Sequence, residues 1–252
     1  MPALRASSWF PAALAALGFI TAVPDAAAGI VIDTTRVVYP AARREVTINI
    51  RNNSQTPSLV QAWLDTGDEH SKPGDSGVPF VLTPPLFRLD PTKSQSLRMV
   101  YTQEPLPTDR ESLFWLNVLD VPPRAAKSPD RPNQLEMAFK HRMKVFFRPA
   151  GLKGSAADAP AQLAWKLATR DGKLVAIQAN NPTAYHVSLI KLTATLDGKP
   201  VLFKTEMVGP FASGTFPVEA PVNAPGAAIE VEYTFVNDYG GNVKATASAS
   251  VP

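Results

Sequence analysis

The amino-acid sequence predicts an all-β protein built from two sandwich domains. Apolar residues recur at every second position far more often than at helical spacing, which is typical of half-buried strands. The 25 prolines and 14 glycines divide the chain into short runs that end in turns. One internal segment loses both its aromatic residues and its alternation, and this separates the expected strands into two groups, each the size of one sandwich.

The composition is that of a folded globular chain. The 252 residues carry a net charge of +3, with 45% hydrophobic and 19% charged residues, so a sizeable core can form and disorder is excluded. The absence of cysteine excludes disulfides, cysteine-ligated metal sites and thiol nucleophiles. Because the densest basic cluster, residues 140–144, lies inside an apolar, strand-like run, we expect no nucleic-acid partner.

Residues 1–28 have the pattern of a cleaved secretory signal peptide. One early cation, Arg5, precedes an apolar stretch over residues 9–23, and the alanines at 26–28 form the small-residue site that signal peptidases accept. The stretch is shorter than the ~20 residues that a membrane-spanning helix needs. We therefore expect a soluble protein outside the cytoplasm, with a mature chain that starts near Gly29.

Short apolar alternations mark the expected strands in both halves of the chain. Polar, glycine or proline residues bound each run, as in many-stranded sandwiches. The expected strands cover residues 46–50, 58–64, 80–82, 96–101, 113–119, 135–147, 174–179, 187–196 and 229–236. Asp171-Gly172 and Asp197-Gly198 lie between such runs and have the composition of two-residue hairpin turns.

A change in composition after Pro149 divides the chain into domains. Residues 150–160 are mostly small or polar and are typical of a linker. We expect one sandwich over residues 29–149 and a second over residues 161–252, because each segment is near the size of a seven-stranded sandwich.

The sequence offers no catalytic or metal-binding constellation. His70, His141 and His186 lie far apart without the spacing of metal ligands, and no phosphate-binding loop or nucleophile elbow is present. Residues 74–79 resemble the loop around the nucleophile of trypsin-like proteases, but Val78 replaces its second glycine and only His70 precedes it. We therefore expect no enzyme and no cofactor.

Several motifs, in order along nearly the whole mature chain, carry a resemblance to a known family. The motifs are TRVVY at 35–39, TPPLFRL at 83–89, LPTDRESLFWLNV at 106–118, VPP at 121–123, MKVFFRP at 143–149, NPT at 181–183 and NDYG at 237–240. In these motifs the chain resembles the periplasmic pilus-assembly chaperones, which escort fimbrial subunits to an outer-membrane usher. The tract at residues 109–117 is the most specific of them.

The resemblance implies a fold and a function. The implied fold is a pair of immunoglobulin-like sandwiches set as an L, with subunits bound in and beside the cleft. The implied function is that of a periplasmic chaperone that binds, folds and caps pilin subunits by donor-strand complementation and delivers them to the usher. The short connection from Arg124 to Gln134 and the absence of cysteine match the short-loop branch of the family.

Residues 135–140 are the candidate donor segment. Leu135, Met137 and Phe139 would project to one side of a strand, because strand side chains alternate. From the spacing alone, these side chains fit the protein's own core equally well. The resemblance implies that they fill successive sites in the open groove of a pilin subunit.

Two cations match the family's cleft residues, which hold the C-terminal carboxylate of the subunit. They are Arg36 and Lys144, and both side chains can hold a carboxylate by charge-assisted hydrogen bonds. Considered singly, each is better explained as a surface cation on a sandwich strand. Arg142 lies on the same strand face as Lys144 and is an alternative to it. His141 departs from the family pattern, which suggests the hypothesis of pH-sensitive client binding.

Three further charges, Glu111, Arg148 and Asp238, match the family's interdomain salt-bridge network. The resemblance implies that they orient the domains without touching the client, whereas each residue alone fits a solvated charge.

The competing class of function is a secreted β-sandwich adhesion or scaffold protein that binds a partner without donating a strand. For a chaperone without a client, the alternative partner is a second copy of the chain, which would form a self-capping homodimer.

Overall fold

The structure is a computed structural model in which nearly all regular secondary structure is β. It describes residues 29–75, 77–124, 135–196, 198–223, 225–226 and 228–250. The expected leader, most of the connection between Arg124 and Gln134, and Asp197 of the second hairpin lie outside these residues. Within the described ranges, no helix is long and apolar enough to cross a membrane.

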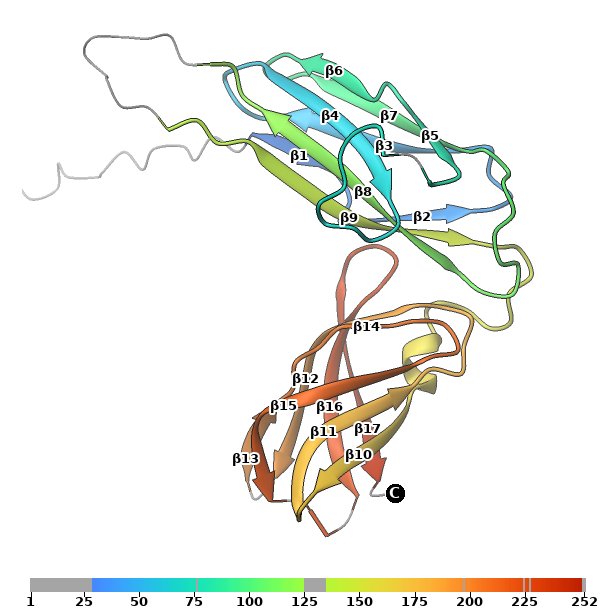
Figure 1. Ribbon diagram of the computed structural model, residues 1–252, viewed down its shortest axis with the longest axis vertical. Helices are drawn as coiled ribbons and strands as arrows, with labels where there is room; N and C mark the ends of the chain where they lie inside the picture. Colours follow the sequence, from blue (N-terminus) through green and yellow to red (C-terminus); the bar gives the residue numbers. More distant parts are fainter. Residues whose placement is uncertain are drawn as a thin grey trace, which may run out of the picture.

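The first domain is a sandwich of two sheets around one apolar core (Figure 1). One sheet has the strand order β1-β3-β7-β5 and the other β2-β9-β8-β4-β6. Alternate residues face inward from both sheets, so that Ile50 and Leu116 are fully buried. The strands are β1 (Ile30–Ile32), β2 (Arg36–Pro40), β3 (Glu45–Asn52), β4 (Ser58–Asp65), β5 (Phe80–Thr83), β6 (Leu86–Leu89), β7 (Ser94–Tyr101), β8 (Ser112–Val121) and β9 (Phe139–Arg148).

The first segment of this domain changes sheets, and this change positions the site. β1 pairs antiparallel with β3, whereas β2 pairs in parallel with β9 on the opposite sheet. The β2 pairing covers only Lys144 to Arg148 of β9. The outer edge of β9 from Phe139 to Met143 therefore pairs with no strand of the described chain.

The second domain consists of one continuous sheet that closes around its own core. Its strand order is β13-β12-β16-β17-β10-β11-β15, with β14 on β12, and β17 meets β10 in parallel. A short 3-10 helix, η2 (Ala159–Gln162), precedes it and contributes the fully buried Ala159 to its core. The strands are β10 (Ala164–Arg170), β11 (Lys173–Asn180), β12 (Val187–Leu196), β13 (Lys199–Leu202), β14 (Met207–Val208), β15 (Ser213–Asn223), β16 (Ile229–Val236) and β17 (Asn242–Ser250).

The expected strands and turns are mostly present, with one correction. The Asp171-Gly172 turn is confirmed, since these residues have φ angles of 50° and 72° and join β10 to β11. The strand expected from residue 135 is wrong for its first four residues, because β9 begins at Phe139. Phe139 pairs with Asp120 near the end of β8, so residues 135–138 have no neighbouring strand within the described chain.

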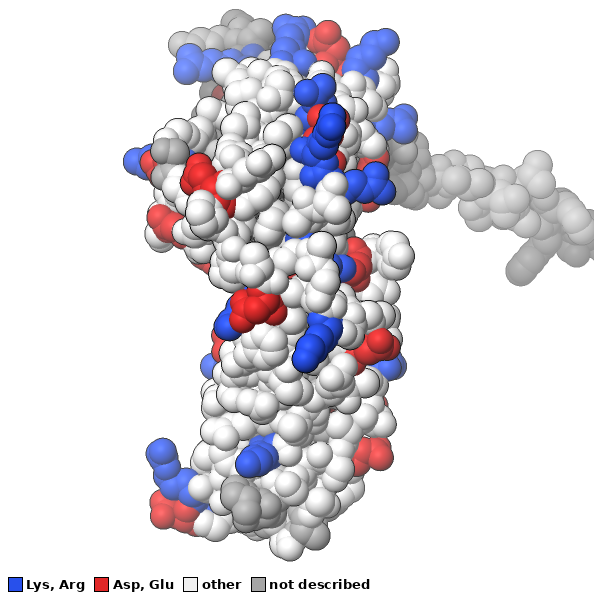
Figure 2. All heavy atoms as spheres, turned by 90° about the vertical axis from the view of Figure 1, so that its right-hand side faces the viewer, with Lys and Arg blue, Asp and Glu red and all other residues white. Residues whose placement is uncertain are grey.

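The two domains form an L in which the first domain's strands run across those of the second (Figure 1). The molecule narrows where the domains meet, and Figure 2 shows charged side chains of both signs at this junction. The same view shows charges gathered on part of the first domain, whereas most of the visible second domain is uncharged. The junction is therefore where charged groups from both domains come together.

Candidate functional site

The parallel pairing of β2 with β9 brings two cations together beside the interdomain cleft. Arg36 is the register partner of Lys144, so both side chains project from the same face of the sheet. Both are partly buried. The structure thus brings together two predicted site residues that are far apart in sequence.

Neither cation has a carboxylate partner among the described residues, since none of the ion pairs there includes Arg36 or Lys144. The Arg36 guanidinium donates a 2.8 Å hydrogen bond to the carbonyl oxygen of Val236 and lies 5.7 Å from the centre of the Phe146 ring. Its Nε–H is buried without an acceptor. The Lys144 ammonium lies 5.6 Å from the centre of the Trp115 ring.

The surroundings disfavour the positive charge of both side chains. Burial lowers the pKa of the Arg36 guanidinium, although the more distant charges of Asp238 and Glu111 oppose this effect. Burial also lowers the pKa of the Lys144 ammonium, and the neighbouring Arg36 charge adds to the decrease. An anion between the two groups would relieve both effects.

Arg142, the neighbour on the same strand face, already has a counterion. Its guanidinium lies 2.9 Å from the Asp65 carboxylate, donates a 2.9 Å hydrogen bond to the Asp68 carbonyl and covers the Trp115 ring at 4.7 Å. Only 15% of the Arg142 side chain is exposed. Geometry therefore distinguishes Arg142 from Lys144, which the sequence left open.

Asp65 is the centre of a buried polar network that holds the loop after β4 on β9. Its carboxylate accepts hydrogen bonds from Asn117 at 2.6 Å and from Ser71 at 2.8 Å, in addition to the Arg142 pair. Burial alone would raise the pKa of this carboxyl, but the hydrogen bonds and the Arg142 charge outweigh it and lower the pKa. The Lys140 ammonium fastens the same loop through a 2.6 Å hydrogen bond to the Glu69 carbonyl.

The three charges expected at the domain junction lie in contact. Arg148 at the end of β9 places Nε 2.7 Å from Glu111 and both terminal nitrogens on Asp238, at 2.7 and 3.0 Å. Burial lowers the pKa of Arg148, but the hydrogen bonds and charges of Asp238 and Glu111 raise it by more. The second Glu111 oxygen accepts a 2.8 Å hydrogen bond from the His186 backbone and lies 3.1 Å from its Nδ1.

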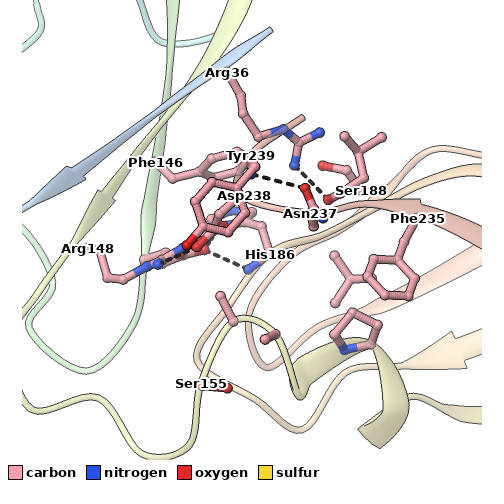
Figure 3. Close-up of a pocket in the computed structure, with 16 residues that line it drawn as sticks. Arg36, Phe146, Arg148, Ser155, His186, Ser188, Phe235, Asn237, Asp238 and Tyr239 are labelled. Atoms are coloured by element: carbon pink, nitrogen blue, oxygen red, sulfur yellow. Dashed lines mark hydrogen bonds and ion pairs between the residues drawn. The ribbon is translucent and has the colours of Figure 1, made fainter. Parts of the chain in front are cut away.

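A cavity of about 290 Å³ lies beside this network in the cleft (Figure 3). Its lining includes Arg36, Phe146 and Arg148 from the first domain and Ser188 and Tyr239 from the second. The Ser188 hydroxyl is buried without a hydrogen-bond partner, and Tyr239 is 95% exposed. The cavity wall beside Arg36 therefore includes one buried hydroxyl without a partner in the described chain.

The three apolar residues of the candidate donor segment lie outside the domain core. The exposed fractions are 84% for Leu135, 53% for Met137 and 54% for Phe139. Further along β9, Met143 and Val145 have the same parity and are buried in the core. The apolar row of β9 thus continues beyond the sandwich as an exposed stripe.

Several side chains that shape this site are not predicted from the sequence. Phe146 and Trp115 provide rings for the cations, Asp65 removes Arg142 from the cleft, and His186 completes the Glu111 contacts. Phe146 and Trp115 lie inside the motifs shared with the family, so the sequence did indicate that they could belong to the site. No signal in the sequence connected Asp65 or His186 to partners that are distant along the chain.

Among the described residues, no group of His, Cys, Asp or Glu side chains is arranged to hold a metal ion. The site geometry in this part of the chain is that of a binding cleft with cations and an adjoining apolar stripe.

Both domains match known families. Residues 29–153 match the family described as "Pili and flagellar-assembly chaperone, PapD N-terminal domain", and residues 158–247 match "Pili assembly chaperone PapD, C-terminal domain". The chain is 38% identical over 237 residues to the probable fimbrial chaperone YadV of Escherichia coli K12, covering 92% of this chain and 96% of YadV. It is 39% identical over 234 residues to the chaperone protein FimB/FhaD of Bordetella pertussis, covering 91% and 92%.

Solved structures show the same likeness. The crystal structure of the YadV chaperone has a TM-score of 0.74 at 35% identity, covering 88% of this chain and 100% of that chain. The structure of the Salmonella enterica SafA pilin in complex with the SafB chaperone has a TM-score of 0.69 at 30% identity, covering 88% and 96%.

Proposed function

Because this chain belongs to the family of pilus-assembly chaperones, we propose that it captures a pilin subunit by anchoring the subunit's C-terminal carboxylate and completing its sandwich with a strand. The protein is a chaperone of pilin subunits, and both of its domains support this assignment. A relative, the SafB chaperone, was solved in complex with the SafA pilin. The family consists of chaperones, and the proposed action makes and breaks no covalent bond.

The observation that carries the proposal is a pair of half-buried cations to which no described residue offers a carboxylate partner. Arg36 and Lys144 are register partners, and burial lowers the pKa of both. A carboxylate placed between them would accept hydrogen bonds from both groups and neutralise their repulsion. A chain terminus fits this requirement, because it brings a carboxylate at the end of an extended strand.

The open edge of β9 sets the direction of the captured strand. Among the described strands, none pairs with this edge from Phe139 to Met143, and Lys144 follows directly where β2 begins to pair. A subunit strand that ends at Lys144 and occupies this edge must run in the same direction as β9. The pairing is therefore parallel, and the anchored carboxylate fixes which groove site each donor residue enters.

Leu135, Met137 and Phe139 supply the apolar part of the interaction. All three are more than half exposed in the free chain, so the groove of a subunit can bury them without disturbing the chaperone core. Each such burial stabilises the complex by roughly 1.5–3 kcal/mol. Backbone pairing along β9 adds affinity that depends little on the client's sequence.

We assign Glu111, Arg148 and Asp238 the role of fixing the angle between the domains. Their contacts join the first domain to the β16–β17 loop and engage all three guanidinium nitrogens of Arg148. The proposal is supported by the burial of Glu111, of which 1% is exposed.

The cellular part of the proposal is export, capture and delivery. The family is periplasmic, and the leader pattern of residues 1–28 supports signal cleavage after Ala28. We propose that the loaded chaperone delivers its subunit to an outer-membrane usher. A client-free chaperone has the option of a self-capping homodimer, since its β9 edge and apolar stripe stay open. The scaffold alternative is not favoured, because it leaves the two unpaired cations without a role.

Co-expression with a pilin tests the anchor. An Arg36→Ala, Lys144→Ala double variant should bind the subunit on the order of 100-fold or more weaker, because two charge-assisted hydrogen bonds to one carboxylate are lost. The measurement is the amount of soluble pilin and of co-purified complex in the periplasm.

The matched control is the Arg51→Ala, Lys93→Ala double variant, which removes the same two charges from exposed positions of the first domain. It should capture pilin like the wild type. Equal capture by the anchor variant and the wild type would contradict the proposed carboxylate site.

A further inference from the structure

Asp120 is a buried carboxylate to which the described part of the chain offers no counterion. It lies near the end of β8, is 5% exposed and belongs to none of the ion pairs among the described residues. One oxygen, Oδ2, accepts a 3.3 Å hydrogen bond from the backbone N–H of Ile30, whereas Oδ1 is buried and has no partner. Buried carboxylates are normally paired, so this one indicates a missing cation.

The residue beside this carboxylate is Gly29. A Cβ atom built on Gly29 would lie 2.6 Å from Asp120 Oδ2, so the two residues are immediate neighbours. The backbone nitrogen on the same Cα must then lie within about 5 Å of that oxygen. The Gly29 carbonyl accepts a 3.1 Å hydrogen bond from Asn53, which holds the backbone in place.

The other neighbours of Asp120 supply no charge. Its register partners are Val60 on β4 and Phe139 on β9, and the nearest residue of β1 is Ile30. All three are uncharged, so none of these described neighbours is a counterion of Asp120, whereas Gly29 lies directly beside it.

We propose that the α-ammonium group of Gly29, formed when the leader is removed after Ala28, is the counterion of Asp120. The inference rests on the proposed export and cleavage, and the match to the family's N-terminal domain begins at this same residue. In the precursor this nitrogen is a neutral amide. Hydrolysis of the Ala28–Gly29 bond consumes one water, leaves a carboxylate on the leader and gives Gly29 an amine, which is protonated at neutral pH.

The ion pair places the processed terminus next to the donor strand. β1 lines a groove of about 440 Å³ together with His141 and Met143 of β9, and Asp120 is the register partner of Phe139. Pairing of Gly29 with Asp120 therefore fixes the start of β1 along this groove. Removal of the leader thus completes an ion pair beside the open edge of β9.

The sign of one substitution tests the proposal. In the mature protein, Asp120→Asn should lower the thermal midpoint by roughly 3–10 °C, because it leaves the ammonium without its partner. The control Asp33→Asn makes the same chemical change at an exposed position just after β1 and should leave the midpoint unchanged. If Asp120 has no counterion, Asp120→Asn removes an uncompensated buried charge, and an unchanged or raised midpoint overturns the proposal.

A second variant displaces the ammonium group and leaves the Asp120 carboxylate in place. A chain that retains Ala28 before Gly29 should lose as much stability as Asp120→Asn, and the two changes together should cost no more than either alone. Additive losses would show that Gly29 and Asp120 do not act as a pair.

If the variants do not fold, measurements on the wild-type protein still test the proposal. Mass spectrometry of the exported protein should give a chain that starts at Gly29, and NMR titration should give an α-amino pKa above the ordinary value of about 8. A different terminus or an ordinary α-amino pKa would overturn the pairing. Pilin capture is measured separately with the Arg36 and Lys144 variants, so failure here leaves the chaperone function intact.

Discussion

At the scale of single residues, Arg36 and Lys144 keep positive charges in surroundings that disfavour them. They lie side by side and are partly buried over the rings of Phe146 and Trp115, and no carboxylate among the described residues pairs with them. Desolvating a cation normally requires compensation. The free site is therefore electrostatically incomplete, and an incoming carboxylate supplies the missing charge.

This arrangement predicts that client binding weakens at alkaline pH through Lys144. Its pKa is lowered in the free protein by burial and by Arg36, and a bound carboxylate raises it again. Because the bound pKa is the higher one, the contribution of Lys144 to affinity is complete below the free pKa and is lost as pH rises through the bound pKa. Pilin affinity measured by calorimetry across the alkaline range should show this loss and proton uptake on binding.

The control for this titration is Lys144→Met, which keeps the stem of the side chain and removes the charge. It should bind pilin more weakly at neutral pH and lose the alkaline dependence. An unchanged pH profile in Lys144→Met would assign the titration to another group.

At the scale of elements, β9 combines three tasks on one strand. Its inward-facing residues complete the core and Arg142 and Lys144 lie on the opposite face. Phe139, its first residue, carries the exposed apolar stripe together with the preceding segment from Leu135. The strand can do this because alternate side chains face opposite sides and because β2 covers only its second half. The free edge is the part on which a partner strand can pair.

Truncation of the stripe should weaken the complex without destabilising the chaperone. Phe139→Ala and Met137→Ala should each reduce pilin affinity roughly 10- to 100-fold, the equivalent of one buried apolar side chain. Because both side chains are more than half exposed, the free energy of unfolding of the free protein should change by less than about 0.5 kcal/mol.

The matched control is Val81→Ala on β5, which truncates a side chain that is 52% exposed on the other sheet. It should leave pilin affinity unchanged. A large loss of stability in Phe139→Ala would instead place this side chain in the chaperone's own core.

The loop held on β9 by Asp65 should make stability sensitive to acid. The folded-state pKa of Asp65 is lowered, since hydrogen bonds and the Arg142 charge outweigh the opposing effect of burial. Its contribution is therefore complete above the unfolded-state pKa of about 3.9 and is lost as pH falls through the folded-state value. Urea unfolding at decreasing pH should show this loss, and Asp65→Asn should remove it.

Asp90→Asn is the control for the loss of stability at acidic pH. Asp90 pairs with Arg88 at the surface, and 57% of its side chain is exposed. It should leave the pH dependence as in the wild type. Equal acid sensitivity in Asp65→Asn and the wild type would contradict a stabilising role of the buried network.

At the scale of the whole molecule, one arginine links the two sandwiches. Arg148 lies between Glu111 of the first domain and Asp238 of the second, and Arg36 adds a hydrogen bond to Val236 across the same junction. Each domain has its own core, so these polar contacts fix the orientation while the cores keep each domain folded.

Removing this link should destabilise the protein and loosen the angle between its domains. Arg148→Ala leaves the Glu111 carboxylate buried without its main partner, so a loss of about 3–5 kcal/mol is expected on urea unfolding. Asp238→Asn affects a side chain that is 36% exposed and should cost about 1 kcal/mol or less. Small-angle scattering should show a broader distribution of shapes for Arg148→Ala.

Arg88→Ala is the matched control, since it removes an arginine from an ion pair at the surface. The Arg88 side chain is 70% exposed. It should change neither stability nor shape by a measurable amount. Wild-type scattering from Arg148→Ala would show that other contacts fix the angle between the domains.

The sequence by itself determined the all-β class, nine of the 17 described strands and the Asp171-Gly172 hairpin, because alternation and turn chemistry are local properties of the chain. It identified Arg36 and Lys144 only through motifs shared with a family. It did not place the start of β9, since a strand begins where a neighbour is available to pair, and that neighbour is β8.

Only the tertiary structure decided which charges are paired. Arg142 and Lys144 are equivalent in the sequence pattern, but Asp65 reaches one and not the other. Likewise, the apolar alternation of Leu135, Met137 and Phe139 suits a core or a surface equally well, and packing left it exposed. Counterions and burial depend on elements far apart along the chain, whose approach is set by the packing of the sheets and not by local sequence.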